Sequence, residues 1–305
     1  MHESDTLVCF NNHMGLWAIE PAYIRQAVSS VQDGTLVARD PSQMCMAVDY
    51  NAASGETVKT AAGGRYTRHA NGLAVVRIDG PMMKGFSKFG GTSTIATRVA
   101  LRSAVDDSKT RAIMIAADTP GGTVAGTQTL ADAVTAAAEE KPVDVFVDDL
   151  LASAGVWATA GATEITASMS SRVGSVGVIA SLVDSSEAAE RDGVRVIEFS
   201  TGAYKGVGME GRPVTDEHEA YMQALVDDMG AMFFAAVTNG RGVTGDQLAE
   251  ITSAKIFSAT QALALGLIDR VAGFEAAVES ILSKASASTV SRRARAAAAR
   301  ARASS

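Results

Sequence analysis

The chain has 305 residues, of which 47% are hydrophobic and 20% are charged, so it can bury a sizeable core and is not a disordered polymer. Its longest charge-free stretch, Leu150–Thr163, is shorter than the roughly 20 apolar residues of a membrane span. The formal net charge is −7, and because residues 284–305 hold six Lys and Arg and no acid, the rest of the chain carries −13. An acidic body disfavours binding to nucleic acid, whose phosphates need a basic surface. We therefore expect neither a nucleic-acid nor a membrane partner.

The amino terminus and the cysteines also exclude several classes. His2, Glu3 and Asp5 stand where a secretory signal would carry Lys or Arg, so we expect the protein to act in the cytoplasm. Cys9 and Cys45 form no CxxC pair, which disfavours a disulfide framework and a structural zinc site. The four histidines are scattered without metal-binding spacing. We expect no metal and no cofactor.

Residues 1–70 show little periodicity, apart from a predicted helix that begins at Pro21 and a polar loop at Asn51–Gly64. From Gly72 onward, apolar runs alternate with amphipathic stretches. The predicted strands are Leu73–Ile78, Ala112–Ala117, Val143–Val147, Glu164–Thr166, Val176–Ile179, Val194–Phe199 and, at an edge, Ile268–Val271. The predicted helices are Thr94–Asp107, Val124–Glu139 and Asp216–Asn239, with further helix starts at Thr244 and Ser258.

This alternation of strands and helices is typical of an α/β fold with a parallel sheet. It divides the chain into an N-terminal extension (1–70), a main domain (71–283) and a basic Ala/Arg-rich tail (284–305). The tail has no apolar face, so we expect it to be disordered.

The first candidate for chemistry is the turn after the strand Ala112–Ala117. The segment Asp118–Gly122 ends in Pro-Gly-Gly just before a helix, and such a turn exposes backbone N–H groups that can hold an anionic oxygen. Alone, Pro-Gly-Gly equally describes an ordinary turn.

The second candidate is Ser153, which follows the strand Val143–Val147 and is flanked by Ala and Gly. A serine at a strand-to-helix junction with small neighbours can approach a scissile carbonyl without obstruction. The alternative is a small residue kept for helix packing.

The third candidate is Lys205, which follows the run Val194–Phe199. A free lysine has a pKa near 10.4, but burial disfavours its charged form, so a desolvated lysine can accept the serine proton. The alternative is a solvated loop lysine, the commoner fate of this residue type.

Together these segments resemble the signal peptide peptidase A-like serine peptidases, which use a Ser-Lys dyad on a Clp protease/crotonase-type fold, a repeated ββα spiral core with a helical C-terminal part. The resemblance covers residues 72–275. It depends on motifs that occur in family order: Asp118–Gly122, Ser153-Ala154-Gly155, Val173–Val178, Ser200-Thr201-Gly202 before Lys205, and Phe257-Ser258 leading into Ala262–Asp269.

The resemblance implies a role for each matching residue. Ser153 is the nucleophile and Lys205 the general base, while the backbone N–H groups of Gly122, beside Gly121, and of Ala154 form the oxyanion hole. Ser175 is implied as a supporting hydroxyl near the lysine.

Within this family, Leu16–Tyr23 and Thr119–Gly126 look more like the tailed-phage capsid assembly (prohead) proteases than the bacterial membrane enzymes. This similarity implies scaffold and capsid proteins as substrates, a ring or dome of protomers, and action in the host cytoplasm inside the prohead. Some phage members carry a scaffold segment fused after the protease, whereas here only the basic tail follows residue 283.

Four other readings stay open. A Ser-His-Asp triad would need His69 or His218, and neither follows a core strand after Ser153. A crotonase-like acyl-CoA enzyme uses two backbone N–H groups but no nucleophilic serine. A bacterial quality-control peptidase would share the dyad but not the capsid substrates, and a non-catalytic shell protein would share neither.

Overall fold

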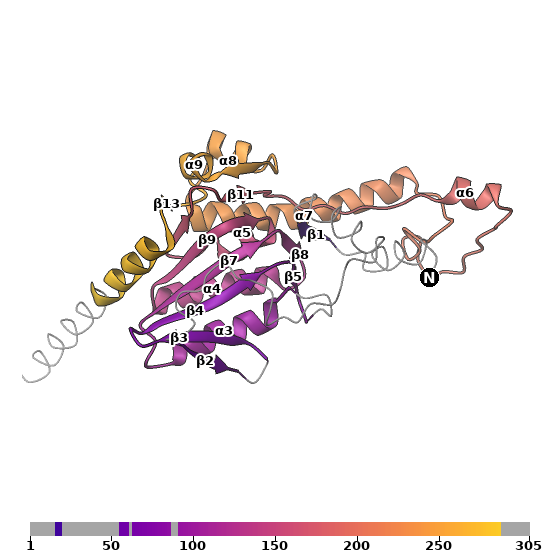
Figure 1. Ribbon diagram of the computed structural model, residues 1–305. Helices are drawn as coiled ribbons and strands as arrows, with labels where there is room; N and C mark the ends of the chain where they lie inside the picture. The colour runs from indigo at the N-terminus through magenta and orange to yellow at the C-terminus, as the bar shows by residue number, and fades with distance from the viewer. Residues whose placement is uncertain (1–15, 20–54, 61–62, 87–90, 288–305) are drawn as a thin grey trace, which may run out of the picture.

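The computed structural model describes residues 16–19, 55–60, 63–86 and 91–287 (Figure 1). The helix predicted from Pro21, Cys9, Cys45, His2 and most of the basic tail lie outside the described residues.

A largely parallel sheet forms the centre of the molecule. Its strands lie in the order β12 (Ile256–Ser258), β11 (Arg172–Gly174), β9 (Val143–Ala152), β7 (Ala112–Thr119), β4 (Leu73–Asp79), β3 (Arg65–His69) and β2 (Gly55–Lys59). The strands β4, β7, β9 and β11 run parallel, and β2, β3 and β12 pair antiparallel. Because both faces of the central strands are covered, β4 and β7 are continuous apolar runs without alternation.

Helices cover both faces of this sheet. On one face, α3 (Thr94–Asp106) and α4 (Thr127–Glu140) pack against each other and enclose the main core. On the other face lies a helix over residues 274–287, whose Val278 and Ile281 contact the second core under β4 and β7. The predicted α/β class is therefore confirmed.

A smaller sheet lies at the carboxyl end of β7. Its strands are β1 (Trp17–Ile19), β8 (Gly121–Thr123), β5 (Met82–Met83) and β6 (Thr92–Ser93), in that order. The strand β8 is the Pro-Gly-Gly turn of the sequence, so this sheet places the turn beside the end of β9.

The helix α7 (Asp216–Arg241) is packed on the body through its C-terminal half alone. Phe233 stacks on Trp157 of α5 (Ala154–Thr159), with ring centroids 4.9 Å apart. The N-terminal half projects away from the sheet together with α6 (Ser186–Arg191), and we call residues 180–228 the arm (Figure 1).

The arm overturns one predicted strand. Residues Val194–Phe199 have no regular secondary structure, and Phe199 is 94% exposed. The run has the composition of a buried strand, but no strand in the described part of the chain pairs with it to accept its backbone hydrogen bonds. Of the run Val176–Ile179, only Ile179 forms a β-bridge, with Trp17.

The C-terminal part is more ordered than the sequence suggests. After α8 (Gly245–Ile251) and α9 (Ala259–Ala264), β13 (Arg270–Val271) pairs with β10 (Glu164–Ala167), which itself pairs with β9. The helix over residues 274–287 then passes through Lys284, where the basic tail was expected to begin. Among the described residues, no helix is long and apolar enough to cross a membrane.

Candidate active site

Ser153 occupies the junction between β9 and α5, as the sequence predicts. Its φ is +53° and its ψ is −116°, a conformation that favours glycine and costs a serine about 1–3 kcal/mol. Two backbone hydrogen bonds hold it there: its N–H donates to Gly174 O at 2.9 Å, and its carbonyl accepts from Trp157 N–H at 3.0 Å. The side chain is almost fully buried, and Oγ donates to Gly177 O at 3.4 Å.

Glycine is required at the two positions that surround this serine. Gly121 has φ +94°, and a Cβ built on it would lie 2.8 Å from Ser153 Cβ and 2.9 Å from Ala154 N. A Cβ on Gly155 would lie 2.5 Å from Thr119 Cγ2. The β8 turn and the start of α5 therefore meet at Ser153, and the backbone of Gly122 follows directly after this contact.

Ser175 lies beside Ser153 on the neighbouring strand. In the parallel register, Gly174 is opposite Ala152, so the residues that follow each strand are also adjacent. Ser175 has φ +52°, is buried, and donates its N–H to Lys255 O at 2.7 Å. The structure brings the two serines together, while the supporting role of Ser175 stays a prediction.

Lys205 is not brought to Ser153 of the same chain. It is exposed on the arm, where the ring of its neighbour Tyr204 contacts the rings of His218 and Tyr221 at centroid distances of 6.1 and 5.0 Å. At about 1.5 Å per residue, some 22 Å of helix separates His218 from Phe233, the residue that packs beside Ser153's own helix. The two predicted catalytic side chains are thus remote within one protomer.

The described histidines do not supply a base at this site. His218 caps α7, where its Nδ1 accepts the Thr215 N–H at 3.3 Å. Thr215 is therefore the N-cap, and the helix begins at Asp216, as the sequence predicts. His69 lies on β3, which β4 and β7 separate from β9, and burial lowers its pKa.

The acidic residue of the Asp118–Gly122 motif is partly buried at the end of β7. Burial raises the pKa of Asp118, and the nearby carboxylates of Asp149 and Asp148 add to this effect. In the described part of the chain, no group of three or more His, Cys, Asp and Glu side chains is arranged to hold a metal ion.

The sequence analysis missed one neighbour of the site. The strand β1 lies between β8 on one edge and Ile179 on the other, and a Cβ on Gly121 would contact Ala18 O as well as Ser153. A three-residue strand has no periodicity to detect, and its pairing depends on residues more than 100 positions away.

Comparison with known proteins identifies the family of this chain. The sequence model of Peptidase family S49 matches residues 135–288, just over half of the chain. The slr0021 protein of Synechocystis sp., a protease by name, is 31% identical over 199 residues, which cover 65% of this chain and 69% of that protein.

Two phage proteins are also similar. Head-tail preconnector protein GP5 of Enterobacteria phage P21 is 28% identical over 263 residues, which cover 83% of this chain and 52% of that protein. Capsid assembly protease C of Escherichia phage lambda is 28% identical over 207 residues, covering 66% of this chain and 46% of that protein. The chain thus spans about half the length of these phage relatives.

Solved structures with a similar arrangement include a ClpP protease catalytic domain from Plasmodium falciparum, with a TM-score of 0.39, 11% identity, and coverage of 65% of this chain and 85% of that chain. An enoyl-CoA hydratase from Polaromonas sp. JS666 gives a TM-score of 0.43 at 13% identity, covering 76% of each chain.

Proposed function

This chain belongs to peptidase family S49, a family of serine peptidases, and from that premise we propose that Ser153 is the nucleophile and that the backbone N–H groups of Gly122 and Ala154 bind the oxyanion. The conformation of Ser153 carries this proposal. A buried serine held at positive φ, with Gly121 against its Cβ, is strained for no gain in packing, and such strain persists where it positions a reactive group.

We propose further that Lys205 of a neighbouring copy is the general base. A base must take the proton of Ser153 Oγ and later give it to the leaving amine. Within one protomer Lys205 is remote from Ser153 and exposed, so it is neither in reach nor desolvated. Contact with a second protomer would supply both conditions, because burial at the interface disfavours the charged form of a lysine.

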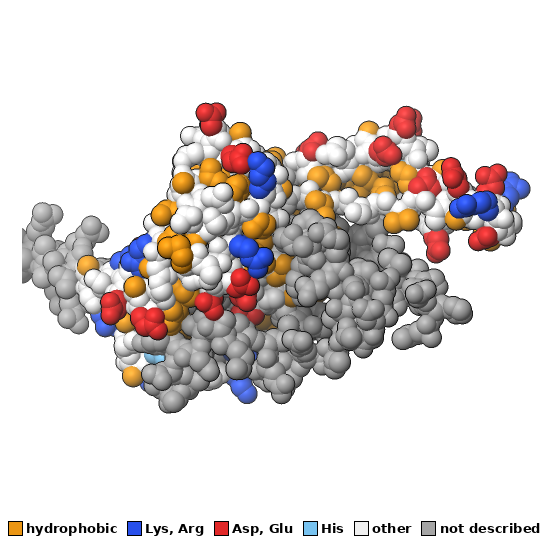
Figure 2. Space-filling model, turned by 45° about the horizontal axis from the view of Figure 1, so that its top comes forward, with side chains coloured by type: hydrophobic (Ala, Val, Ile, Leu, Met, Phe, Trp, Pro, Cys, Tyr) orange, Lys and Arg blue, Asp and Glu red, His pale blue; other side chains and the backbone are white. Residues whose placement is uncertain are grey.

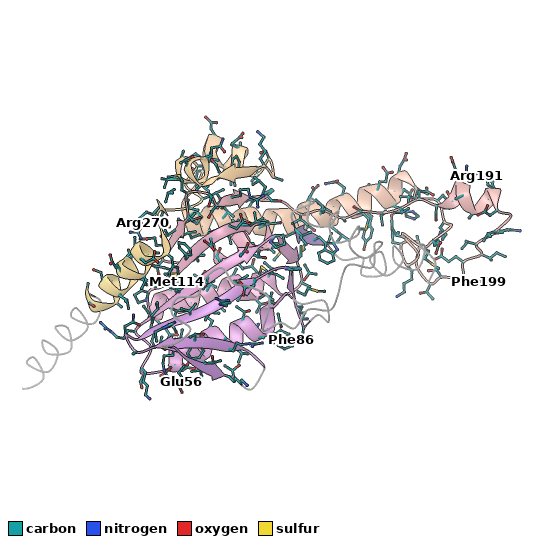
Figure 3. All side chains as sticks on the ribbon, in the orientation of Figure 1. Glu56, Phe86, Met114, Arg191, Phe199 and Arg270 are labelled. Atoms are coloured by element: carbon teal, nitrogen blue, oxygen red, sulfur yellow. The ribbon has the colours of Figure 1, made fainter. Side chains whose placement is uncertain are left out.

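The surface of the arm supports such a contact. Apolar side chains gather along it and are exposed in the single chain (Figure 2), whereas monomeric proteins rarely leave large contiguous apolar patches in water. These residues are Val183, Val194, Val196, Ile197, Phe199, Tyr204, Met209 and Tyr221. Phe199 lies at the far end of the arm, away from the sheet (Figure 3). We propose that the arm packs on the body of the next copy in a closed ring or dome.

For the substrates, we propose the scaffold and capsid proteins of a phage or prophage, digested inside the prohead in the host cytoplasm. The names of the two phage relatives support this choice. A ring of protomers would confine the sites and so restrict digestion to proteins that enter it.

A quality-control peptidase is the second candidate. Protease 4 of Salmonella typhi is 28% identical over 207 residues, which cover 68% of this chain and 33% of that protein. The same dyad would serve that function, so the two candidate functions differ in their substrates and not in their catalytic site. A crotonase-like acyl-CoA enzyme uses no nucleophilic serine, so that function would not explain the strained conformation of Ser153.

The test combines labelling and digestion. A serine-reactive fluorophosphonate should modify Ser153 in the wild-type protein and leave the Ser153→Ala protein unlabelled. Incubation with phage scaffold and capsid proteins, followed by mass analysis, should give discrete products in the wild type alone. Absence of labelling in an assembled protein would contradict a serine peptidase, while labelling with digestion of unrelated proteins alone would favour quality control.

A further inference from the structure

The strand β1 is bound along both of its edges next to Ser153. On one edge, Trp17 N–H donates to Ile179 O at 3.0 Å, and Ile179 N–H donates to Trp17 O at 2.8 Å. On the other edge, β1 runs antiparallel to β8, with Ala18 opposite Gly122, and Val124 N–H donates to Leu16 O at 3.0 Å. An extended peptide that adds a strand to an exposed sheet edge is held in the same way.

The register places one carbonyl group at the predicted oxyanion hole. In an antiparallel pair, hydrogen-bonded residues alternate with non-bonded residues, so Ala18 and Gly122 form the same kind of pair as Leu16 and Val124. The Gly122 N–H therefore faces Ala18 O. The contact point at Gly121 confirms this position, because a Cβ there would touch Ala18 O, Ser153 Cβ and Ala154 N together.

The side chains of β1 also fit a peptide bound for cleavage. Ala18 is fully buried, and Ile19 on its carboxyl side is buried as well. The residue whose carbonyl lies at Ser153 is thus small, and the next peptide bond, between Ala18 and Ile19, lies where a scissile bond would lie.

We infer that β1 is an internal substrate, and that the protein cleaves its own chain between Ala18 and Ile19. This inference rests on the proposed function, because it uses the same nucleophile and the same base. It goes beyond that function because it assigns a processing site. It also explains why β1 occupies the position between β8 and Ile179 that any other peptide substrate would have to take.

The chemistry balances with water as the co-reactant. Ser153 Oγ attacks the carbonyl carbon of Ala18, and its proton passes through the base to the nitrogen of Ile19 as the C–N bond breaks. Residues 1–18 are then held as an ester on Ser153. Water hydrolyses this ester, which leaves a carboxylate on Ala18, restores the serine and frees Leu16-Trp17-Ala18 to leave the position beside β8.

The experiment follows the intact mass of the full chain with time, in parallel with digestion of a labelled protein substrate. The wild-type protein should lose residues 1–18 and the Ser153→Ala protein should keep them. Ala18→Ser, which keeps a small side chain, should be processed like the wild type. Ala18→Lys should remain full-length, because a charged side chain at this fully buried position carries a large desolvation cost.

Two further measurements keep the test decisive. Fluorophosphonate labelling of Ser153 in the Ala18→Lys protein shows that this variant is folded, and a synthetic peptide of residues 12–24 should be cut by the wild type between Ala18 and Ile19. A wild type that digests the protein substrate but keeps residues 1–18 and leaves the peptide intact would overturn the internal substrate while the proposed function stands. Cleavage at another bond would overturn it equally, and absence of both labelling and digestion would overturn the proposed function itself.

Discussion

The backbone of Ser153 is held in a conformation that glycine adopts without cost, and this has a measurable consequence. Its single side-chain hydrogen bond, to Gly177 O, is long at 3.4 Å and contributes little. We expect Ser153→Ala and Ser153→Gly both to lose peptidase activity, by at least about a thousandfold, because the covalent pathway needs the hydroxyl. Because glycine relieves the strain, Ser153→Gly should be more stable than Ser153→Ala by about 1 kcal/mol. Urea unfolding measures the difference in stability, and turnover of a labelled protein measures the loss of activity. An active Ser153→Ala protein would refute the assignment of Ser153 as the nucleophile.

Gly121 tests the contact between the β8 turn and the nucleophile. A methyl group there would collide with Ser153 Cβ and Ala154 N, and φ +94° would strain any other residue. Gly121→Ala should therefore destabilise the fold by about 2 kcal/mol and lower the turnover rate strongly. Gly85→Ala is the matched control, because nothing lies within 4 Å of a Cβ at that position. Equal stability and rate in the two variants would mean that the turn is not tightly fitted to Ser153.

At the scale of elements, the sequence predicted the helices and strands that pack against other elements of the same domain. The buried runs that became β4 and β7 and the amphipathic helices α3 and α4 were predicted because their periodicity reflects packing inside the domain. The run Val194–Phe199 was misread as a strand, because an apolar composition does not show whether a neighbouring strand is available to pair with the run. The Ser153 junction was predictable from local sequence, whereas the distance to Lys205 depends on the length and direction of α7.

The helix over residues 274–287 is attached to the sheet by a partly buried ion cluster. Lys284 Nζ donates to Asp144 Oδ2 and Glu164 Oε2, both at 2.7 Å. Burial raises the pKa of Asp144 to about 6, even against the effect of Lys284. For Glu164, burial also acts upward, but Lys284 outweighs it and lowers the pKa. The lysine therefore partners two carboxylates that would otherwise repel each other in a dry environment.

Removing Lys284 should lower the free energy of unfolding most at a pH where Asp144 and Glu164 are both charged. A carboxyl group whose pKa is raised on folding weakens the fold as the pH rises through the raised value, so loss of its cation should be tolerated better below pH 6. We expect Lys284→Met to lower the free energy of unfolding by about 2 kcal/mol at pH 8 and by less than half of that at pH 5. Lys255→Met, which removes an exposed pair with Glu250, should change it by less than about 0.5 kcal/mol at either pH. A Lys284→Met effect independent of pH would contradict this account.

At the scale of the whole molecule, the arm exposes apolar side chains that the described residues leave uncovered. We expect Phe199→Asp to weaken self-association and reduce peptidase activity together, with the melting temperature of the protomer unchanged, because this side chain has almost no contacts in its own chain. Met169→Asp is the control, since Met169 is also largely exposed but lies on the body. Sedimentation velocity and substrate turnover measure the two effects. An assembled, fully active Phe199→Asp protein would show that the arm tip is not at an interface.

If the serine and the lysine of each site come from different protomers, two inactive proteins should restore each other. Ser153→Ala contributes an intact Lys205, and Lys205→Ala contributes an intact Ser153, so random mixing in a closed ring should rebuild both groups at about one site in four. We expect the mixed assembly to recover activity on the order of a quarter of the wild-type value after dissociation and reassembly, while each variant alone stays inactive. Mixing Ser153→Ala with a chain that carries both substitutions should recover nothing, which controls for the effect of assembly itself. Lys205→Arg in place of Lys205→Ala should be inactive on its own as well, because arginine stays protonated and cannot accept the serine proton. Assembled mixtures without any activity would place both catalytic groups in one protomer and require the arm to fold back onto its own body.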